Sequence, residues 1–254
     1  MVSFVIFRAC HVIITLGLIV TFLGNASASP PNSLTVRDPR PLAKAIQELE
    51  KRYGWQITYE DPPYSHDSDM PDVTPSVQVG SGLAPGATGV TVPKAAILTF
   101  PLPAANQDEL GTVNAVVKIY NESHRGFEFA VVQAGSLLHV VPRKATGLSG
   151  NFEPVKPVLD TVITIEPRER TSYALIKEIC NKISVSTNTH VGIGYIPVNM
   201  LFNTKTSIGG SGKTARSILE QWILETGGGL SWLLLYEPKE YALNIIGVTS
   251  VNKP

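Results

Sequence analysis

Two stretches of this chain carry the same order of expected elements, and this repetition is the feature that most limits the fold. Apolar spacing predicts the first set as a strand at 33–36, a helix at 42–53, strands at 55–60 and 97–100, a helix at 109–120 and a hairpin at 127–131 and 137–141. It predicts the second set as a strand at 162–165, a helix at 175–183, strands at 191–195 and 206–208, a helix at 215–222 and a hairpin at 230–236 and 240–246. The sequence therefore predicts an α+β fold of two tandem βαββαββ modules, each with two helices packed on small sheets.

The closing hairpins support a duplication most directly. The segments FEFAVVQAGSLLHVV and LSWLLLYEPKEYALNII follow their helices in the same order, and Leu230 lies 103 residues after Phe127 (230 minus 127). We place the first module at 29–145, with a Pro-rich and Gly-rich loop inserted at 61–94, a linker at 146–157 and the second module at 158–254. One continuous sheet running through both halves would count against this division.

The N-terminal segment 1–28 has the pattern of a signal peptide. An apolar run from Val12 to Leu23 follows Arg8, and small residues at Ala26 and Ala28 fit a cleavage site after Ala28. The run is shorter than the roughly 20 apolar residues that a permanent transmembrane helix needs. We therefore expect a periplasmic or secreted protein without a membrane span after cleavage.

Charge and cysteine content narrow the expected partners and the chemistry. The formal net charge is zero, so no basic excess is present to neutralise the phosphates of a nucleic acid or an anionic membrane surface. Cys180 is the single cysteine after the predicted cleavage site, which leaves no partner for an internal disulfide. It falls on the apolar side of a predicted helix, where a free cysteine behaves as a small hydrophobe.

Two segments carry the elements of a known family. The segment LAKAIQELEKRYGWQITYEDPPY in the first half and TARSILEQWILETGGGLSWLLLYEPKEYALNI in the second resemble the short N-terminal domain shared by secretins and TonB-dependent receptors. The resemblance implies a small α+β domain in the cell envelope that docks onto other proteins. It also implies that the domain carries no catalytic residues.

Three other patterns invite chemical interpretations that the sequence supports poorly. The string Gly209–Thr214 (GGSGKT) lacks the first glycine of a phosphate-binding loop, because Ser207 stands there, so a helix-capping turn is favoured over nucleotide binding. The oxygen ligands of His66–Asp69 and Asp72 match no defined ion-binding spacing, which favours a solvated acidic loop. The histidines His124, His139 and His190 are interpreted as surface or edge residues.

We therefore expect a non-catalytic binding or assembly module of the cell envelope, without a cofactor, a metal site or a nucleotide. An envelope protein partner would dock on exposed sheet edges or in the groove between the modules. Four aromatic residues are candidates for partner binding, with packing under the helices as the competing interpretation: Trp55, Tyr59, Trp232 and Tyr241. The alternatives are an envelope-polymer hydrolase and a small-ligand-binding protein, either of which would use the cleft between the modules.

Overall fold

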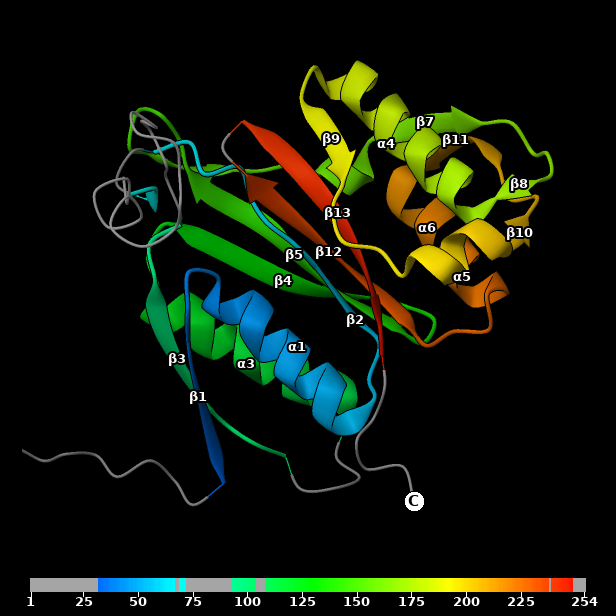
Figure 1. Ribbon diagram of the computed structural model, residues 1–254. Coiled ribbons are helices and arrows are strands. Elements are labelled where there is room, and N and C mark those ends of the chain that lie inside the picture. Colours follow the sequence, from blue (N-terminus) through cyan, green and yellow to red (C-terminus); the bar gives the residue numbers. More distant parts are fainter. Residues whose placement is uncertain (1–31, 67–68, 72–92, 104–107, 238, 249–254) are drawn as a thin grey trace, which may run out of the picture. The chain divides into compact units, whose positions relative to one another are not determined.

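The computed structural model describes residues 32–66, 69–71, 93–103, 108–237 and 239–248, and they form an α+β fold (Figure 1). The predicted fold class is therefore confirmed. The predicted signal peptide and the parts 67–68 and 72–92 of the inserted loop lie outside the described residues. Within the described ranges, no helix is long and apolar enough to cross a membrane.

The first half contains the elements that its apolar spacing predicts. They are β1 (Ser33–Asp38), α1 (Pro41–Tyr53), β2 (Ile57–Glu60), β3 (Ala96–Pro101), α3 (Glu109–Ser123), β4 (Phe127–Ala134) and β5 (Leu137–Thr146). The predicted linker is partly structured, because β6 (Phe152–Pro154) pairs with the end of β5 and is followed by the short 3-10 helix η2 (Val158–Asp160).

The second half has more elements than its sequence pattern predicts. They are β7 (Val162–Ile165), β8 (Arg170–Thr171), α4 (Ser172–Thr187), β9 (His190–Ile193), α5 (Val198–Asn203), β10 (Lys205–Thr206), β11 (Gly210–Thr214), α6 (Ala215–Glu225), β12 (Leu230–Glu237) and β13 (Glu240–Gly247). The strand predicted at 206–208 is wrong in position. Only the two residues of β10 are extended there and they pair with β8, whereas the strand before α6 is β11.

Local signals explain where the long helices begin and end. Pro41 begins α1, where its missing N–H costs nothing, and Gly54 ends it with a left-handed φ of 72°. The side chains of Thr171 and Thr214 accept hydrogen bonds from backbone N–H groups in the first turns of α4 and α6. Each helix turns its apolar stripe toward the sheet, and the burial of that stripe stabilises it there.

A single mixed sheet runs through both halves in the order β4-β5-β2-β12-β13-β9. The strands of the two halves meet at β2 and β12, which pair in parallel with Tyr59 opposite Leu233. The prediction of two modules with separate small sheets is therefore not confirmed. The halves are instead joined edge to edge by hydrogen bonds, a long-range pairing that local sequence patterns do not encode.

The pairing pattern nevertheless repeats on each side of this junction. In the first half β4 pairs antiparallel with β5, β5 pairs in parallel with β2, and β1 and β3 form a separate antiparallel pair. In the second half β12, β13 and β9 have the same relations, and β7 and β11 form the separate pair. The junction therefore joins the β2 edge of one repeat to the β12 edge of the next.

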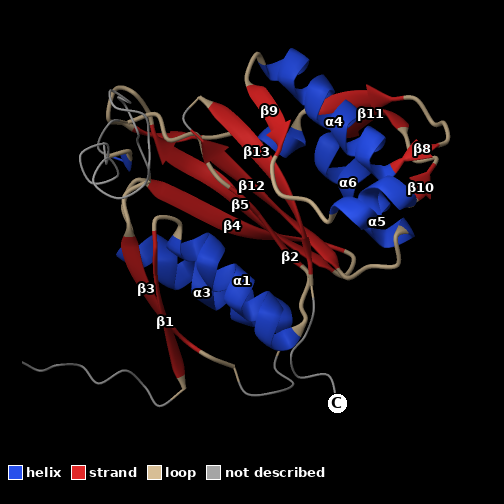
Figure 2. Cartoon of the chain, viewed as in Figure 1, coloured by secondary structure: helices blue, strands red, loops and turns tan. Residues whose placement is uncertain are grey.

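The two halves place their helices on opposite faces of the shared sheet (Figure 2). Neighbouring residues of β12 show this, since Leu233 packs in the core under α1 and α3 whereas Leu234 packs in the core under α4 and α6. In β5, Leu138 and Leu137 divide between the two cores in the same way. Each core therefore contains side chains from the other half.

Candidate functional site

The four aromatic residues proposed as partner contacts lie mostly inside the protein. Tyr59, Trp232 and Tyr241 are buried in the two cores, where they contact other side chains rather than solvent. Trp55 is half-buried and stacks on Tyr53 with ring centroids 4.6 Å apart. Because the alternation of a strand predicts which residues share a face but not how much covers that face, the sequence did not separate these cases.

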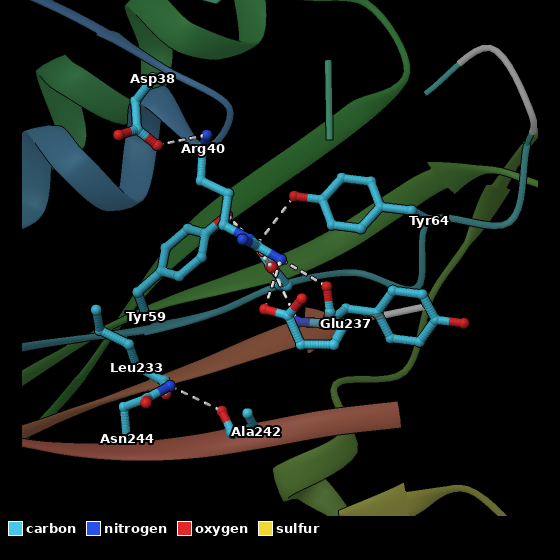
Figure 3. A network of polar contacts seen from close by, with 10 residues as sticks. Asp38, Arg40, Tyr59, Tyr64, Leu233, Glu237, Ala242 and Asn244 are labelled. Carbon is cyan, nitrogen blue, oxygen red and sulfur yellow. Dashed lines mark hydrogen bonds and ion pairs between the residues drawn. The ribbon is translucent and has the colours of Figure 1, made fainter. Parts of the chain in front are cut away.

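A buried carboxylate lies where β2 meets β12 (Figure 3). Arg40 Nε donates to Asp61 Oδ2 at 2.6 Å, and the N–H of Tyr236 donates to the same oxygen at 2.9 Å. The hydroxyls of Tyr59 and Tyr64 donate to Oδ1 at 2.7 and 3.1 Å. We call these five residues the junction cluster.

The junction cluster is a structural clamp. Burial raises the pKa of the Asp61 carboxyl, while the charge of Arg40 and the hydrogen bonds of its partners lower it. Both carboxylate oxygens already accept two hydrogen bonds, so little of their capacity remains for a substrate. Arg40 also donates to the carbonyl of Tyr236 at 2.6 Å and thereby ties the start of α1 to β12.

A second buried carboxylate lies on the other face of β2. Arg216 Nη2 donates to Glu60 Oε2 at 2.6 Å, and the N–H of Leu159 donates to Glu60 Oε1 at 3.2 Å. The same guanidinium holds Asp160 through Nε at 2.8 Å. Burial raises the pKa of the Glu60 carboxyl, while the charge and hydrogen bond of Arg216 lower it. The Arg216–Glu60 ion pair therefore joins the two halves directly, whereas the Arg40–Asp61 pair lies within the first half and reaches the second through the main chain of Tyr236.

One arrangement resembles a nucleophile, base and acid. Thr58 Oγ1 lies 2.7 Å from His139 Nδ1, and His139 Nε2 lies 3.0 Å from Glu220 Oε1. Thr58 and His139 are both 0% exposed, and the imidazole stacks on Trp232 with centroids 5.3 Å apart. A hydroxyl sealed inside the sheet cannot reach a substrate, so these residues form a packing and hydrogen-bonding unit. The prediction that His139 lies on the surface or at an edge is wrong, because α6 of the second half covers that face of β5.

The other two histidines lie where the chain is more open. His124 is half-buried and stacks on Tyr120 with ring centroids 4.4 Å apart. The side chain of His190 is 66% exposed and its Nδ1 lies 2.9 Å from Glu240 Oε2. Their positions agree with the surface or edge location predicted for them.

The GGSGKT string forms part of a strand rather than a phosphate-binding loop. Gly210–Thr214 is β11, which pairs antiparallel with β7, and Thr214 caps the following helix through the N–H of Ser217 at 3.2 Å. The predicted cap is therefore present, but the turn before it is wrong. Lys213 of β11 places its Nζ 3.4 Å from Oε1 of Gln221, which lies on α6.

A cavity of about 230 Å³ opens beside the junction cluster. Arg40 and Tyr64 line it together with Lys94, His124 and Arg125. Arg40 is committed to Asp61, at 2.6 Å. The cavity lies within the first half, so it is not the cleft between modules that the enzyme and ligand-binding alternatives predict.

Cys180 and the acidic loop carry side chains that could react or bind a metal ion. Cys180 is buried in the core of the second half, as predicted, and burial raises the pKa of its thiol to about 12, so it stays a neutral thiol. Asp67, Ser68 and Asp72 lie outside the described residues. Within the described part of the chain, no group of three acidic, His or Cys side chains is placed to hold a metal ion.

One outer edge of the shared sheet is β4, and a side chain of α3 caps part of it. Asn121 Nδ2 donates to the carbonyl of Phe129 at 2.9 Å, and the N–H of Phe129 donates to Asn121 Oδ1 at 3.0 Å. Because outward-facing groups alternate along a strand, the main-chain groups of Val131 and Gln133 also face outward. No described residue hydrogen-bonds to them.

The other outer edge is β9, and a side chain of α4 caps its start. Ser184 Oγ accepts from the N–H of Val191 at 2.9 Å, and the outward groups of Ile193 follow this cap. After the strand, Tyr195 turns its main chain toward β13, where its N–H donates to Asn244 Oδ1 at 2.7 Å and its carbonyl accepts from the N–H of Ile245 at 2.8 Å. Tyr195 is 71% exposed directly after this strand.

Sequence reasoning missed the residues that organise these sites. The apolar pattern places Glu60 at a strand end and Asp61 in a loop, although two acids that follow three residues of a buried strand are a detectable signal. Asn121 gave no signal, because an asparagine near a helix end is common on surfaces. Comparison with protein-family models, with curated proteins and with solved structures gave no match for this chain.

Proposed function

We propose that this chain is an exported, non-catalytic binding and assembly protein of the cell envelope that docks a protein partner on the open part of its β4 edge. The observation that carries the proposal is the outward stretch of β4 that no described residue pairs with. Val131 and Gln133 present outward main-chain groups beside Phe129, whose groups Asn121 satisfies. A partner strand added there would gain main-chain hydrogen bonds, each worth about 0.5–1.5 kcal/mol.

The buried polar groups favour binding over catalysis. Asp61, Glu60 and His139 are the groups best suited to acid or base chemistry, and each is at most 1% exposed and already has partners. An enzyme needs such groups to converge on a cavity where a substrate fits. Here they hold the two halves of the chain together instead.

Two features of the sequence support the envelope setting. The segment 1–28 has the signal-peptide pattern, and each half is similar in its predicted elements to a short domain that docks proteins in the envelope. Because β2 and β12 are used for the junction, we place the docking site at an outer edge of the shared sheet rather than in a groove between separate modules. The proposal therefore rests on the remaining edges rather than on two independent modules.

The test is site-specific photocrosslinking in the native organism. A photoreactive residue at position 133 is expected to give discrete adducts, whereas one at Lys118, whose side chain is 75% exposed on α3, gives none. Mass spectrometry then identifies the crosslinked segment, which we expect to be an extended strand of an envelope protein.

A proline scan of the edge supplies the matched control. Val131→Pro removes an outward N–H without breaking a ladder bond, because proline is tolerated at such edge positions. It should abolish the adducts from position 133, and Val131→Ala should retain them. Equal adducts from both variants would show that strand addition at β4 does not occur.

A further inference from the structure

Among the described residues β4 and β9 form the two outer edges of the sheet, called the free edges below, and they are copies of the two edges that meet at the internal junction. Ala134 and Glu237 are the last residues before the two-residue turns of the two hairpins. Val131 lies three positions before Ala134, and Leu234 lies three positions before Glu237. Gln133 and Tyr236 correspond in the same way. The outer edge of β4 therefore matches the edge of β12 that receives β2.

The same comparison matches β9 with β2. Tyr59 pairs with Val140, the fourth residue of the strand after its turn, and Ile193 pairs with Leu243, the fourth residue after the other turn. Ile193 therefore occupies the place of Tyr59. It also packs partly against the core of its own half, as Tyr59 does.

The direction of the strands allows the junction to repeat between molecules. β4 and β9 are separated by two antiparallel pairs, β4–β5 and β12–β13, and the other pairs on the path are parallel. The two edge strands therefore point the same way. A neighbouring copy in the same orientation presents β4 parallel to β9, which is the relation of β12 to β2.

On this basis we infer that a second copy of this chain fits the free edges, with β9 of one copy adding in parallel to β4 of the next and Ile193 facing Ala130. The inference rests on the proposed docking function and names its partner. Because the two surfaces differ, the contact is head-to-tail and does not close on itself as a symmetric dimer does, so further copies can add at either end.

Hydrogen bonds at the internal junction show which groups the second copy would use. At the junction the N–H of Asp61 donates to the carbonyl of Leu234 at 2.8 Å, and the matching carbonyl at the free edge belongs to Val131. A cap at the start of the incoming strand is compatible with pairing, because Glu50 Oε1 accepts from the N–H of Ile57 at 3.2 Å while β2 is paired. Ser184 holds Val191 at the corresponding place in β9.

Apolar contacts at the junction have counterparts at the free edges as well. Leu233 of β12 is buried in the core under α1 and α3, and the matching residue of β4 is Ala130, which is half-buried. Beside β9, Val185 on α4 is 85% exposed and Tyr195 is 71% exposed. Tyr195 stands at the place of Asp61, which is 1% exposed inside the junction.

One asparagine limits this assembly, because Asn121 occupies both outward main-chain groups of Phe129. In β12 the residue that matches Phe129 is Trp232, and no described asparagine side chain bonds to its main chain, which faces the paired strand β2 instead. Release of Asn121 should therefore strengthen self-association.

The test is cysteine crosslinking of the purified protein. Ala130→Cys combined with Ile193→Cys places two thiols on adjacent parallel strands, within the spacing that a disulfide spans, and native Cys180 is buried and does not compete. Mild oxidation of this double variant should give a ladder of dimers, trimers and longer species. Each single variant should remain monomeric.

Variants of the caps give a second measurement by sedimentation of proteins without added cysteines. In the unaltered protein an incoming strand must replace the two hydrogen bonds between Asn121 and the main chain of Phe129. Asn121→Ala removes these bonds beforehand, so it is expected to lower the dissociation constant of self-association by about tenfold. Asn114→Ala is the matched control, because Asn114 is exposed on the same helix and donates only to Leu110 within it. It should leave the association unchanged.

The outcomes separate this inference from the proposed function. A double variant that stays monomeric, an Asn121→Ala protein that associates no more than Asn114→Ala, or a dimer from Ala130→Cys alone would overturn head-to-tail assembly. If Val131→Pro still abolished the photoadducts in that case, docking at β4 would stand with another envelope protein as the partner. A third outcome is a ladder of crosslinked copies together with photoadducts to another protein that persist in the Val131→Pro variant. In that case self-assembly would stand, and docking of the other protein at β4 would be excluded.

Discussion

Asp61 and Arg40 show how two side chains fix the meeting point of the two halves. The carboxylate is 1% exposed and has four donors, so its desolvation is offset by partners that come from both sides of the junction. Neither residue stands out in the sequence, where Arg40 lies between two prolines and Asp61 precedes two more.

Asp61→Asn should destabilise the protein strongly. The change removes the buried counter-charge of the Arg40 guanidinium and leaves only the half-exposed carboxylate of Glu237, 3.5 Å away; breaking a buried pair from one side costs about 3–5 kcal/mol. Urea unfolding measures this loss, and Glu169→Gln, which breaks an exposed pair with Lys205, should leave the free energy of unfolding almost unchanged. Equal effects of the two variants would contradict the clamp.

Glu50 should make stability depend on pH. Burial raises the pKa of this carboxyl to about 8, above its ordinary value of 4.5, so the folded protein holds the proton more tightly than the unfolded chain. Its contribution is therefore complete below pH 4.5 and is lost as pH rises toward 8, with a slope of at most about 1.4 kcal/mol per pH unit.

Glu50→Gln isolates that contribution. The amide keeps an oxygen to accept from the N–H of Ile57 but does not titrate, so its stability should fall less than that of the unaltered protein between pH 4.5 and 8. Chemical denaturation at several pH values gives the comparison, with Glu48→Gln on the same helix as the control. Parallel pH profiles for all three proteins would show that Glu50 is ionised throughout.

At the scale of single elements, the strand β11 and its cap illustrate what a motif alone conveys. The glycines of GGSGKT suggest a loop, but β11 completes a pair with β7, and Gly209 lies so close to the chain after β7 that a Cβ atom would be 2.5 Å from the carbonyl oxygen of Ile165. Gly209 therefore serves the close approach of two chain segments, whereas Gly212, with a φ of 65° and open space around it, serves the backbone conformation.

Thr214→Ala should remove the cap of α6. The Thr214 hydroxyl accepts the N–H of Ser217, and losing such a cap costs about 0.5–2 kcal/mol. Thr214→Ser should restore most of this stability in thermal unfolding. The midpoint should not respond to added ATP in any of the three proteins, and a nucleotide-dependent rise would revive the phosphate-loop interpretation.

Most long elements were predictable because their signals are local. Helical spacing located α1, α3, α4 and α6, and alternation located the hairpins β4–β5 and β12–β13. The two-residue strands β8 and β10 and the six-residue helix α5 are too short for any periodicity to emerge. The partner of β2 could not be predicted, because parallel pairing with β12 depends on contacts far apart in the chain.

At the scale of the whole molecule, the shared sheet makes the halves interdependent. Leu233 belongs to the core under α1 and α3, and Leu137 belongs to the core under α4 and α6. The repeated pairing pattern favours an origin by duplication, yet each repeat completes its core with side chains of the other.

Residues 29–145 and 158–254 expressed separately should therefore fail to fold as monomers, and mixing them should restore structure. Hydrogen exchange and size-exclusion chromatography of each half and of the mixture would show this. Leu233→Ala in the intact chain should cost about 2–5 kcal/mol and destabilise α1 as well as β12. A half that unfolds cooperatively as a monomer would support the independent modules that the sequence predicts.

The pairing of β2 with β12 also sets the order in which the protein is completed. β2 ends at Glu60, but the strand it needs begins at Leu230, 170 residues later (230 minus 60), so the first half lacks part of its core until most of the second half has been synthesised. A nascent polypeptide whose sheet stays incomplete for so long remains unfolded enough to pass through a secretion pore. For a protein that we propose to be exported, late closure of the sheet keeps the chain ready for translocation.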